Sequence, residues 1–294
     1  MSYFLVNIKK EYDGYLFSDF LSSFSLANDK IKYLLNNKCC YINGQVANAE
    51  SKLKTDDSIC IDTNHYDDND IIPEERDLNI LYEDEYLLIV SKPAKCIIYS
   101  DDSKKTKTMA NYISNYYLKN DLSYKVRHVH RLDFDTTGCL IYAKDIITHS
   151  ALSAMVEHKT LTRKYLAIVE GVFPKKKGKV DYSIGKDRHI NSKMIVSKTG
   201  KRALTNYQVL DEKNNKSLVE LKLETGRTHQ IRVHMAYIKH PLVGDKLYGS
   251  NISFERVLLH SSCVEFIHPI TKELLIVKDV MPIDMKMNFE NKKS

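Results

Sequence analysis

The chain has 294 residues, of which 43% are apolar and 28% charged, and it contains 19 Tyr and 9 Phe. This apolar content excludes a fully disordered chain, and the length suggests two domains. No stretch is long and apolar enough to span a membrane, and the first fifteen residues lack the pattern of a secretory signal. We therefore expect a monomeric cytoplasmic protein with no membrane partner.

The net charge of +6 is unevenly distributed along the chain. Residues 1–76 hold 8 Lys and Arg against 13 Asp and Glu, whereas residues 77–294 hold 36 against 25. Solubility alone could produce such an imbalance. A large region with an excess of positive charge also favours an anionic partner, of which nucleic acid is the leading class.

Two helices, a hairpin and a closing strand are predicted in the first 64 residues. Apolar residues recur at helical spacing in 15–24 and 28–37. The dipeptide Asn43-Gly44 separates two short strands, 40–42 and 45–46, and a further strand is predicted at 58–61. Residues 65–76 are acidic, contain Pro73 and lack an apolar period. We interpret them as a linker between a small α/β module at 1–64 and a second domain at 77–294.

The second domain is predicted to consist mainly of short strands. Helices are expected at 108–117 and 147–157, and strands at 79–82, 86–90, 139–143, 165–169, 203–210, 218–224, 228–233, 257–259 and 262–266. Scattered helices without a regular alternation of strand and helix indicate an α+β fold with a mixed, largely antiparallel sheet.

The densest group of polar residues lies just before the strand at 139–143. Asp133 and Asp135 stand in a segment that also contains Arg127, His128, His130 and Arg131. Asp135 fits an Asx-type turn that bonds the local backbone. Asp133 is less easily explained in this way, because a carboxylate among several cations stays ionised, as a nucleophile or an ion-pair partner must.

A second polar group occupies residues 224–234. If 228–233 is a strand, polar residues lie on both of its faces, so it is not simple core. His229 and His234 could suggest a metal, but no third ligand lies nearby, and the six cysteines lack the spacing of zinc ligands. We expect no metal, and an arginine next to a carboxylate is the more natural interpretation.

These residues resemble the RluA family of pseudouridine synthases. Residues 130–138 are similar to the central motif of the family, and 225–234, with 240–245 and 248–249, to its C-terminal motif. Further similar motifs follow the family order at 82–93, 164–171, 258–260 and 266–269. Five ordered motifs between residues 77 and 280 are far more specific than one short pattern.

The resemblance implies a role for each matching residue. Asp133 would attack the target uridine so that its base detaches, rotates and rejoins through carbon 5. Tyr165 would stack on the flipped base and take part in proton transfer, and Arg227 would pair with Asp133. A carboxylate nucleophile needs no cofactor, and none is expected.

The family pattern also implies contacts with the RNA and the base. Arg131 would fill the space that the flipped nucleotide leaves, with His130 beside it as an RNA contact. Ile231 and Val233 would line the floor of the pocket.

Residues 15–63 resemble a small RNA-binding module first known from a protein of the small ribosomal subunit. Lys30, Lys32 and Lys38 would be its RNA contacts. On one helix Lys30 and Lys38 would be roughly aligned, while Lys32 would point elsewhere.

The leading hypothesis is therefore a pseudouridine synthase that acts on structured RNA, either ribosomal or transfer RNA. The alternative is a non-catalytic RNA-binding or ribosome-assembly protein on the same fold. A glycoside hydrolase would need a second positioned carboxylate, and Asp135 is expected to be occupied by its turn.

Overall fold

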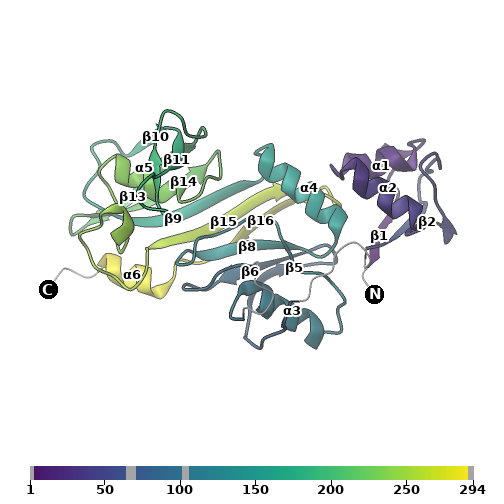
Figure 1. Ribbon diagram of the computed structural model, residues 1–294, viewed down its shortest axis with the longest axis horizontal. Helices are drawn as coiled ribbons and strands as arrows, with labels where there is room; N and C mark the ends of the chain where they lie inside the picture. The colour runs from purple at the N-terminus through teal and green to yellow at the C-terminus, as the bar shows by residue number, and fades with distance from the viewer. Residues whose placement is uncertain (1–2, 64–70, 101–105, 291–294) are drawn as a thin grey trace.

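The computed structural model describes residues 3–63, 71–100 and 106–290, which form two main sheets (Figure 1). A four-stranded sheet belongs to the N-terminal part of the chain, and a ten-stranded sheet belongs to the rest. A separate two-stranded sheet contains β11 (Ile184–Lys186) and β12 (Met194–Val196). Within the described ranges, no helix is long and apolar enough to cross a membrane.

The N-terminal sheet is antiparallel and has the order β1-β4-β2-β3. Its elements are β1 (Tyr3–Asn7), the 3-10 helix η1 (Lys10–Tyr12), α1 (Phe17–Ser23), α2 (Asn28–Asn36), β2 (Cys40–Ile42), β3 (Gln45–Val46) and β4 (Ser58–Asp62). The predicted hairpin forms, with positive φ at both Asn43 (50°) and Gly44 (78°), as its turn requires. The sequence did not predict β1, because its apolar residues occupy both faces and Leu5 stays 52% exposed.

The large sheet has the order β10-β13-β14-β9-β15-β8-β6-β5, with β16 paired to β15 and β7 paired to β8. Its pairs are antiparallel except for β15 with β8. This confirms the predicted α+β fold with a mixed, largely antiparallel sheet. The strands are β5 (Asn79–Glu83), β6 (Leu87–Lys92), β7 (Arg127–His128), β8 (Thr137–Ala143), β9 (Thr162–Glu170), β10 (Lys177–Asp181), β13 (Leu204–Lys213), β14 (Lys216–Leu223), β15 (Leu259–Ile267) and β16 (Leu274–Lys278).

The helices of this region are α3 (Met109–Lys119), α4 (Ile146–Glu157), α5 (Gln230–Tyr237) and α6 (Ile283–Glu290), with a 3-10 turn, η2 (Lys246–Tyr248). Local capping sets the start of α3 and α4. Thr108 and Asn111 form a capping box on α3, and the Asp145 carboxylate accepts hydrogen bonds from the first backbone N–H groups of α4.

The predicted strand at 228–233 is wrong, because this segment enters α5. Ile231, Met235 and Ile238 recur at the spacing of a helix, and all three pack in one core cluster. Six residues are too few to distinguish this spacing from strand alternation. The strands predicted at 257–259 and 262–266 are also not separate, since one strand, β15, begins at Leu259.

The N-terminal sheet and helices pack against the large domain. Ile146, Ile147 and Ala151 of α4 share a buried apolar cluster with the N-terminal helices. Tyr86 Oη donates a hydrogen bond of 2.7 Å to the carbonyl of Leu5. Apolar and polar contacts therefore both join the two regions.

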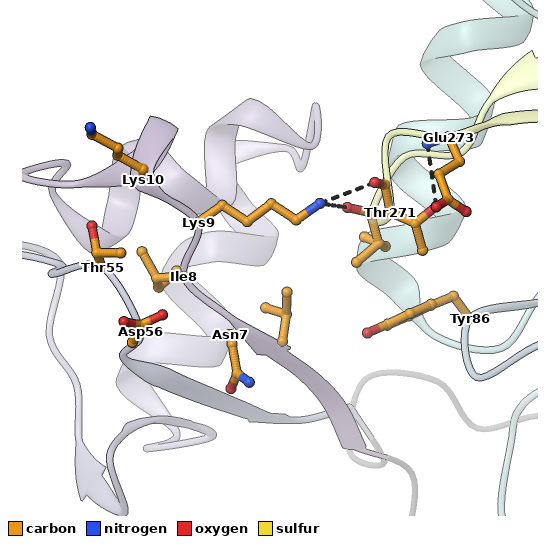
Figure 2. A pocket seen from close by; sticks show the side chains of 11 residues that line it. Asn7, Ile8, Lys9, Lys10, Thr55, Asp56, Tyr86, Thr271 and Glu273 are labelled. Atoms are coloured by element: carbon orange, nitrogen blue, oxygen red, sulfur yellow. Dashed lines mark hydrogen bonds between the residues drawn. The ribbon is translucent and has the colours of Figure 1, made fainter.

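A pocket of about 610 Å³ lies along this junction (Figure 2). Lys9 Nζ reaches across it to the carbonyl oxygens of Thr271, at 3.0 Å, and Ile270, at 3.4 Å. Residues 64–70 of the predicted linker lie outside the described residues. The remainder of it contacts α3, because Asn111 Nδ2 donates to the carbonyl of Ile72 at 2.8 Å. The boundaries at 64 and 77 stay a prediction.

The chains of β8 and β15 come very close together at Gly138. A Cβ atom at Gly138 would lie 2.2 Å from the carbonyl oxygen of Ser261, and the residue has a φ of 106°. Only glycine combines this conformation with this space. The approach of the two strands therefore depends on a glycine at the start of β8.

We expect Gly138→Ala to lower the free energy of unfolding by about 2–6 kcal/mol, because it adds a steric clash to backbone strain. Gly14→Ala is the matched control, since Gly14 also has a positive φ (79°) but has no atom within 4 Å of its Cβ position. It should cost about 1–2 kcal/mol. Urea unfolding measures both variants, and equal losses would contradict the steric argument.

Candidate active site

Asp133 lies in a tight turn between β7 and β8. The backbone N–H of Thr136 donates to the carbonyl of Asp133 at 3.1 Å, and the Asp133 side chain stays 30% exposed. Asp135 does not form the expected Asx turn, because its carboxylate accepts from the backbone N–H of Val257 at 3.4 Å. The turn thus presents one carboxylate outward and uses the other to bind a distant segment.

Two buried cations hold the backbone of this turn. Lys92 Nζ donates to the carbonyls of Phe134, at 3.0 Å, and Cys96, at 2.7 Å, and Arg256 Nη1 donates to that of Asp135 at 3.3 Å. Burial lowers the pKa of Lys92 to about 8, although interactions with Cys96, Asp135 and Asp133 oppose the shift. The carbonyl oxygens that follow Asp133 are therefore fixed from two sides.

Arg232, on the first turn of α5, is the cation that faces Asp133. Its Nη1 lies 3.5 Å from Asp133 Oδ2, while its Nε and Nη2 bind the two oxygens of Asp245 at 2.7 and 2.9 Å. Asp245 is only 1% exposed, and the ring of Tyr248 lies 5.0 Å from the guanidinium carbon. The bidentate pair with Asp245 orients Arg232 toward Asp133.

His229 also lies near the Asp133 carboxylate. Its Nε2 lies 4.0 Å from Asp133 Oδ2, and its Nδ1 shares a hydrogen bond of 2.9 Å with the Tyr248 hydroxyl. Burial lowers the pKa of His229, although the charge of Asp133 opposes the shift. The imidazole is therefore uncharged at neutral pH.

The two histidines that could have suggested a metal do not meet. His234 lies between Thr205 Oγ1 and the carbonyl of Tyr182, both at 2.9 Å, away from the contacts of His229. Within the part of the chain that the structure describes, no group of three or more His, Cys, Asp or Glu side chains could hold a metal ion.

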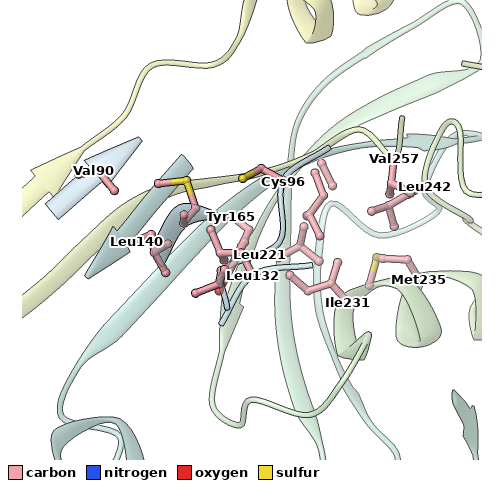
Figure 3. Close-up of a cluster of buried hydrophobic side chains, with 14 of the residues drawn as sticks. Val90, Cys96, Leu132, Leu140, Tyr165, Leu221, Ile231, Met235, Leu242 and Val257 are labelled. Carbon is pink, nitrogen blue, oxygen red and sulfur yellow. The ribbon is translucent and has the colours of Figure 1, made fainter. Parts of the chain in front are cut away.

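Tyr165, on β9, forms part of the apolar wall next to the turn. It is 4% exposed and belongs to the same cluster as Leu132, Leu221 and Ile231 (Figure 3). Burial raises the pKa of its hydroxyl. Val233 does not share this wall, because it packs in a different cluster, so the predicted pairing of Ile231 and Val233 in one pocket floor is wrong.

The structure does not place Arg227 beside Asp133. Arg227 is exposed, and its Nε donates to the carbonyl of Arg202 at 3.1 Å. The family resemblance implied Arg227 as the partner of Asp133, whereas the structure turns Arg232 of α5 toward the carboxylate. The helical spacing of Ile231, Met235 and Ile238 was the signal that could have identified Arg232. Lys92 and Tyr248 lie within the motifs at 82–93 and 248–249, but the sequence analysis assigned no role to either residue.

Arg131 and His130, the predicted RNA contacts beside the turn, differ in exposure. Arg131 is exposed, but His130 is 5% exposed and neither of its ring nitrogens has a hydrogen-bond partner. Burial, followed by the charge of Arg163, lowers the pKa of His130 to about 3. His130 is therefore an interior, uncharged group, and its contact with RNA stays a prediction.

The three lysines of the N-terminal region do not align as predicted. Lys30 is on α2 and half-buried, Lys32 is exposed, and Lys38 lies beyond the C-terminal end of α2 with a φ of 53°. The charge of Lys30 contributes to the lowered pKa of His149, which places it on the side facing α4. A shared helix face for Lys30 and Lys38 is thus wrong, because the helix ends first.

Comparison with known proteins gives consistent results. Residues 86–237 match the family model described as RNA pseudouridylate synthase. The chain is 40% identical to an uncharacterised RNA pseudouridine synthase, YhcT, of Bacillus subtilis, over 95% of this chain and 94% of the relative. It is 34% identical to the ribosomal large subunit pseudouridine synthase D of Zymomonas mobilis, over 90% and 89% of the two chains.

A solved structure extends the similarity to the fold. The chain matches human RNA pseudouridylate synthase domain containing 1 with a TM-score of 0.60 and 25% identity, covering 71% of this chain and 86% of that one.

We expect Arg232→Met to lower the free energy of unfolding by about 3–5 kcal/mol, because it leaves Asp245 buried without its cation. Arg227→Met should cost less than about 0.5 kcal/mol, since Arg227 is exposed. Adding Asp245→Asn to Arg232→Met should recover part of the loss. Chemical unfolding of the three variants checks this, and equal effects of the two single changes would contradict the assigned pairing.

Buried histidines should make the protein less stable in mild acid. Burial lowers the pKa of His130 to about 3 and that of His149 to about 4, against about 6.5 in the unfolded chain. Between pH 6.5 and 4 only the unfolded chain takes up these protons, so stability is lost as the pH falls. Each histidine contributes a slope of about 1.4 kcal/mol per pH unit.

Unfolding at pH 6.5, 5.5 and 4.5 should show a shallower slope for His130→Leu than for the wild type. His158→Gln, at an exposed position, should keep the wild-type slope. An unchanged slope in His130→Leu would mean that His130 is already protonated in the folded protein.

Proposed function

The chain belongs to the RNA pseudouridylate synthase family, and we propose that it isomerises specific uridines of structured ribosomal RNA with Asp133 as its nucleophile. Membership of this family makes it an isomerase that acts on RNA. The enzyme hypothesis is therefore preferred over a non-catalytic RNA-binding protein on the same fold.

The observation that carries the role of Asp133 is its ion pair with Arg232. A nucleophilic carboxylate must be both ionised and reachable. Asp133 is 30% exposed and lies 3.5 Å from a guanidinium that Asp245 holds in place. Asp135, the other carboxylate of the turn, is engaged with the backbone of Val257 and is a poorer candidate.

In the proposed reaction the glycosidic bond between N1 and C1′ breaks and the uracil rotates. C5 then bonds to C1′, a proton leaves C5 and N1 gains a proton, so the product is an isomer of the substrate. Asp133 acts on the uridine to permit this detachment. The Tyr165 hydroxyl is the proposed participant in the proton transfer.

A base inside folded RNA must leave its stack to reach Asp133. The ring of Tyr165 is the proposed surface on which the flipped base stacks, and Ile231 contributes to the same apolar wall. Arg131 is exposed beside the turn and is the proposed residue that fills the vacated space in the RNA.

The substrate is proposed from the names of the relatives and from charge. A relative that is 34% identical over 90% of this chain is named for the large ribosomal subunit. The excess of Lys and Arg after residue 76 suits a phosphate backbone. We also propose that the enzyme works in the cytoplasm as a monomer and that Lys32 and Lys38, both exposed, add RNA contacts from the N-terminal module.

Removing this protein from its cells should erase pseudouridine at one or more sites of large-subunit ribosomal RNA. Mapping pseudouridine in total RNA measures this. Wild-type protein should restore the sites, and Asp133→Asn should not, although it should bind the RNA within a few-fold because phosphate contacts supply most of the affinity.

Asp135→Asn is the matched control, as it changes the neighbouring carboxylate and should retain most activity. Restoration of the sites by Asp133→Asn would refute the nucleophile. Loss confined to transfer RNA would refute the ribosomal substrate.

A further inference from the structure

Arg163, on β9, is a buried cation without a partner. It is 7% exposed, its Nε is buried with no hydrogen bond, and its guanidinium makes no ion pair within residues 3–63, 71–100 and 106–290. A guanidinium keeps its charge in proteins, so burial without a counter-charge destabilises the fold. Because the Arg163 charge is kept although it destabilises the fold, we expect a ligand to supply the negative group.

Arg163 acts on the pKa of two buried neighbours, His130 and Tyr165, neither of which supplies a counter-charge. His130 is its interior neighbour, with both ring nitrogens unpartnered and no charge at neutral pH. His128 in turn acts on His130, and its own pKa is lowered first by burial and then by the charge of Arg131. A neutral imidazole still offers one N–H, so Arg163 and His130 present unused donors side by side.

A glycine, Gly226, lies next to the guanidinium. A methyl group at Gly226 would lie 3.4 Å from Nη2 and 3.5 Å from Nη1 of Arg163, and Gly226 itself is exposed. Any larger side chain there would cover the two nitrogens. The buried guanidinium is therefore close to an exposed position of the backbone that carries no side chain.

Arg163 is also close to the proposed base-stacking residue. Side chains two positions apart project from the same face of a strand, so Arg163 and Tyr165 lie about 7 Å apart along β9. A nucleotide whose base stacks on Tyr165 carries its phosphate one ribose away, which is a comparable distance.

We propose that Arg163, assisted by His130, binds the phosphate of the nucleotide whose base enters the pocket at Tyr165. The inference rests on the proposed function, since it takes a flipped nucleotide as the ligand. Arginine suits this task because its planar donors match two phosphate oxygens at once. The phosphate would supply the missing counter-charge, so the site is completed only when the substrate is bound.

The test compares Arg163→Met, Arg163→Lys and Lys164→Met on an RNA stem-loop that contains the mapped uridine. Lys164 is the matched control, because it is a half-exposed cation on the opposite face of β9. Arg163→Met should raise KM about 10–100-fold. It should also reduce the salt dependence of binding by about one phosphate contact. Arg163→Lys should have a KM and a salt dependence between those of Arg163→Met and the wild type. Lys164→Met should have the same KM and salt dependence as the wild type.

Thermal unfolding separates binding from a structural role. Arg163→Met should be as stable as the wild type or more stable, because it removes an unpaired buried charge. A lower melting temperature together with an unchanged salt dependence would make Arg163 structural and overturn the proposal.

A second test alters the RNA. Two RNAs each carry one uncharged methylphosphonate, either on the 5′ side or on the 3′ side of the target uridine. Wild-type protein should bind one of these two RNAs more weakly than the unmodified RNA. Arg163→Met should be insensitive to that same replacement, and equal sensitivity of both proteins would overturn the proposal. Binding of inorganic phosphate without any RNA effect would also overturn it. A wild type that forms no pseudouridine would instead refute the proposed function, and the salt dependence would still decide the role of Arg163.

Discussion

Arg232 is shared between two carboxylates, one buried and one facing solvent, and the site is arranged around this shared charge. Asp245 takes two of its nitrogens and is 1% exposed, which leaves Nη1 directed at Asp133. If Asp133 were the only partner of Arg232, the guanidinium could adopt other orientations. Because Asp245 fixes its orientation, the positive charge stands opposite the carboxylate before any substrate arrives.

Contacts from segments distant in sequence also hold the turn that carries Asp133. Its carbonyl oxygens would be costly to bury without donors, and Lys92 and Arg256 supply them from β6 and from the segment before β15. Gly138 then allows β8 to run against Ser261 of β15. The position of the Asp133 carboxylate thus depends on residues of three strands of the large sheet, β6, β8 and β15.

Arg232 and Arg163 illustrate two ways of placing a positive charge in the interior of a protein. Arg232 is paired within the protein and therefore contributes to its stability. Arg163 has no such partner and has His130, itself unpartnered, as its neighbour. A site that receives a phosphate gains from the second arrangement, because an internal carboxylate would compete with the ligand for the same guanidinium.

The sequence alone determined the fold class and the catalytic family and predicted roles for Asp133 and Tyr165, because these depend on local motifs and short-range patterns. The hairpin at Asn43-Gly44 and the capped helices α3 and α4 follow from the same local rules. Which arginine meets Asp133 was decided by tertiary structure. Residues 228–233 fit a strand or a helix equally well, and only packing of Ile231, Met235 and Ile238 into the core selected the helix that turns Arg232 inward. The burial of His130 and the isolation of Arg163 arise in the same way, since charge compensation depends on neighbours that are distant in sequence.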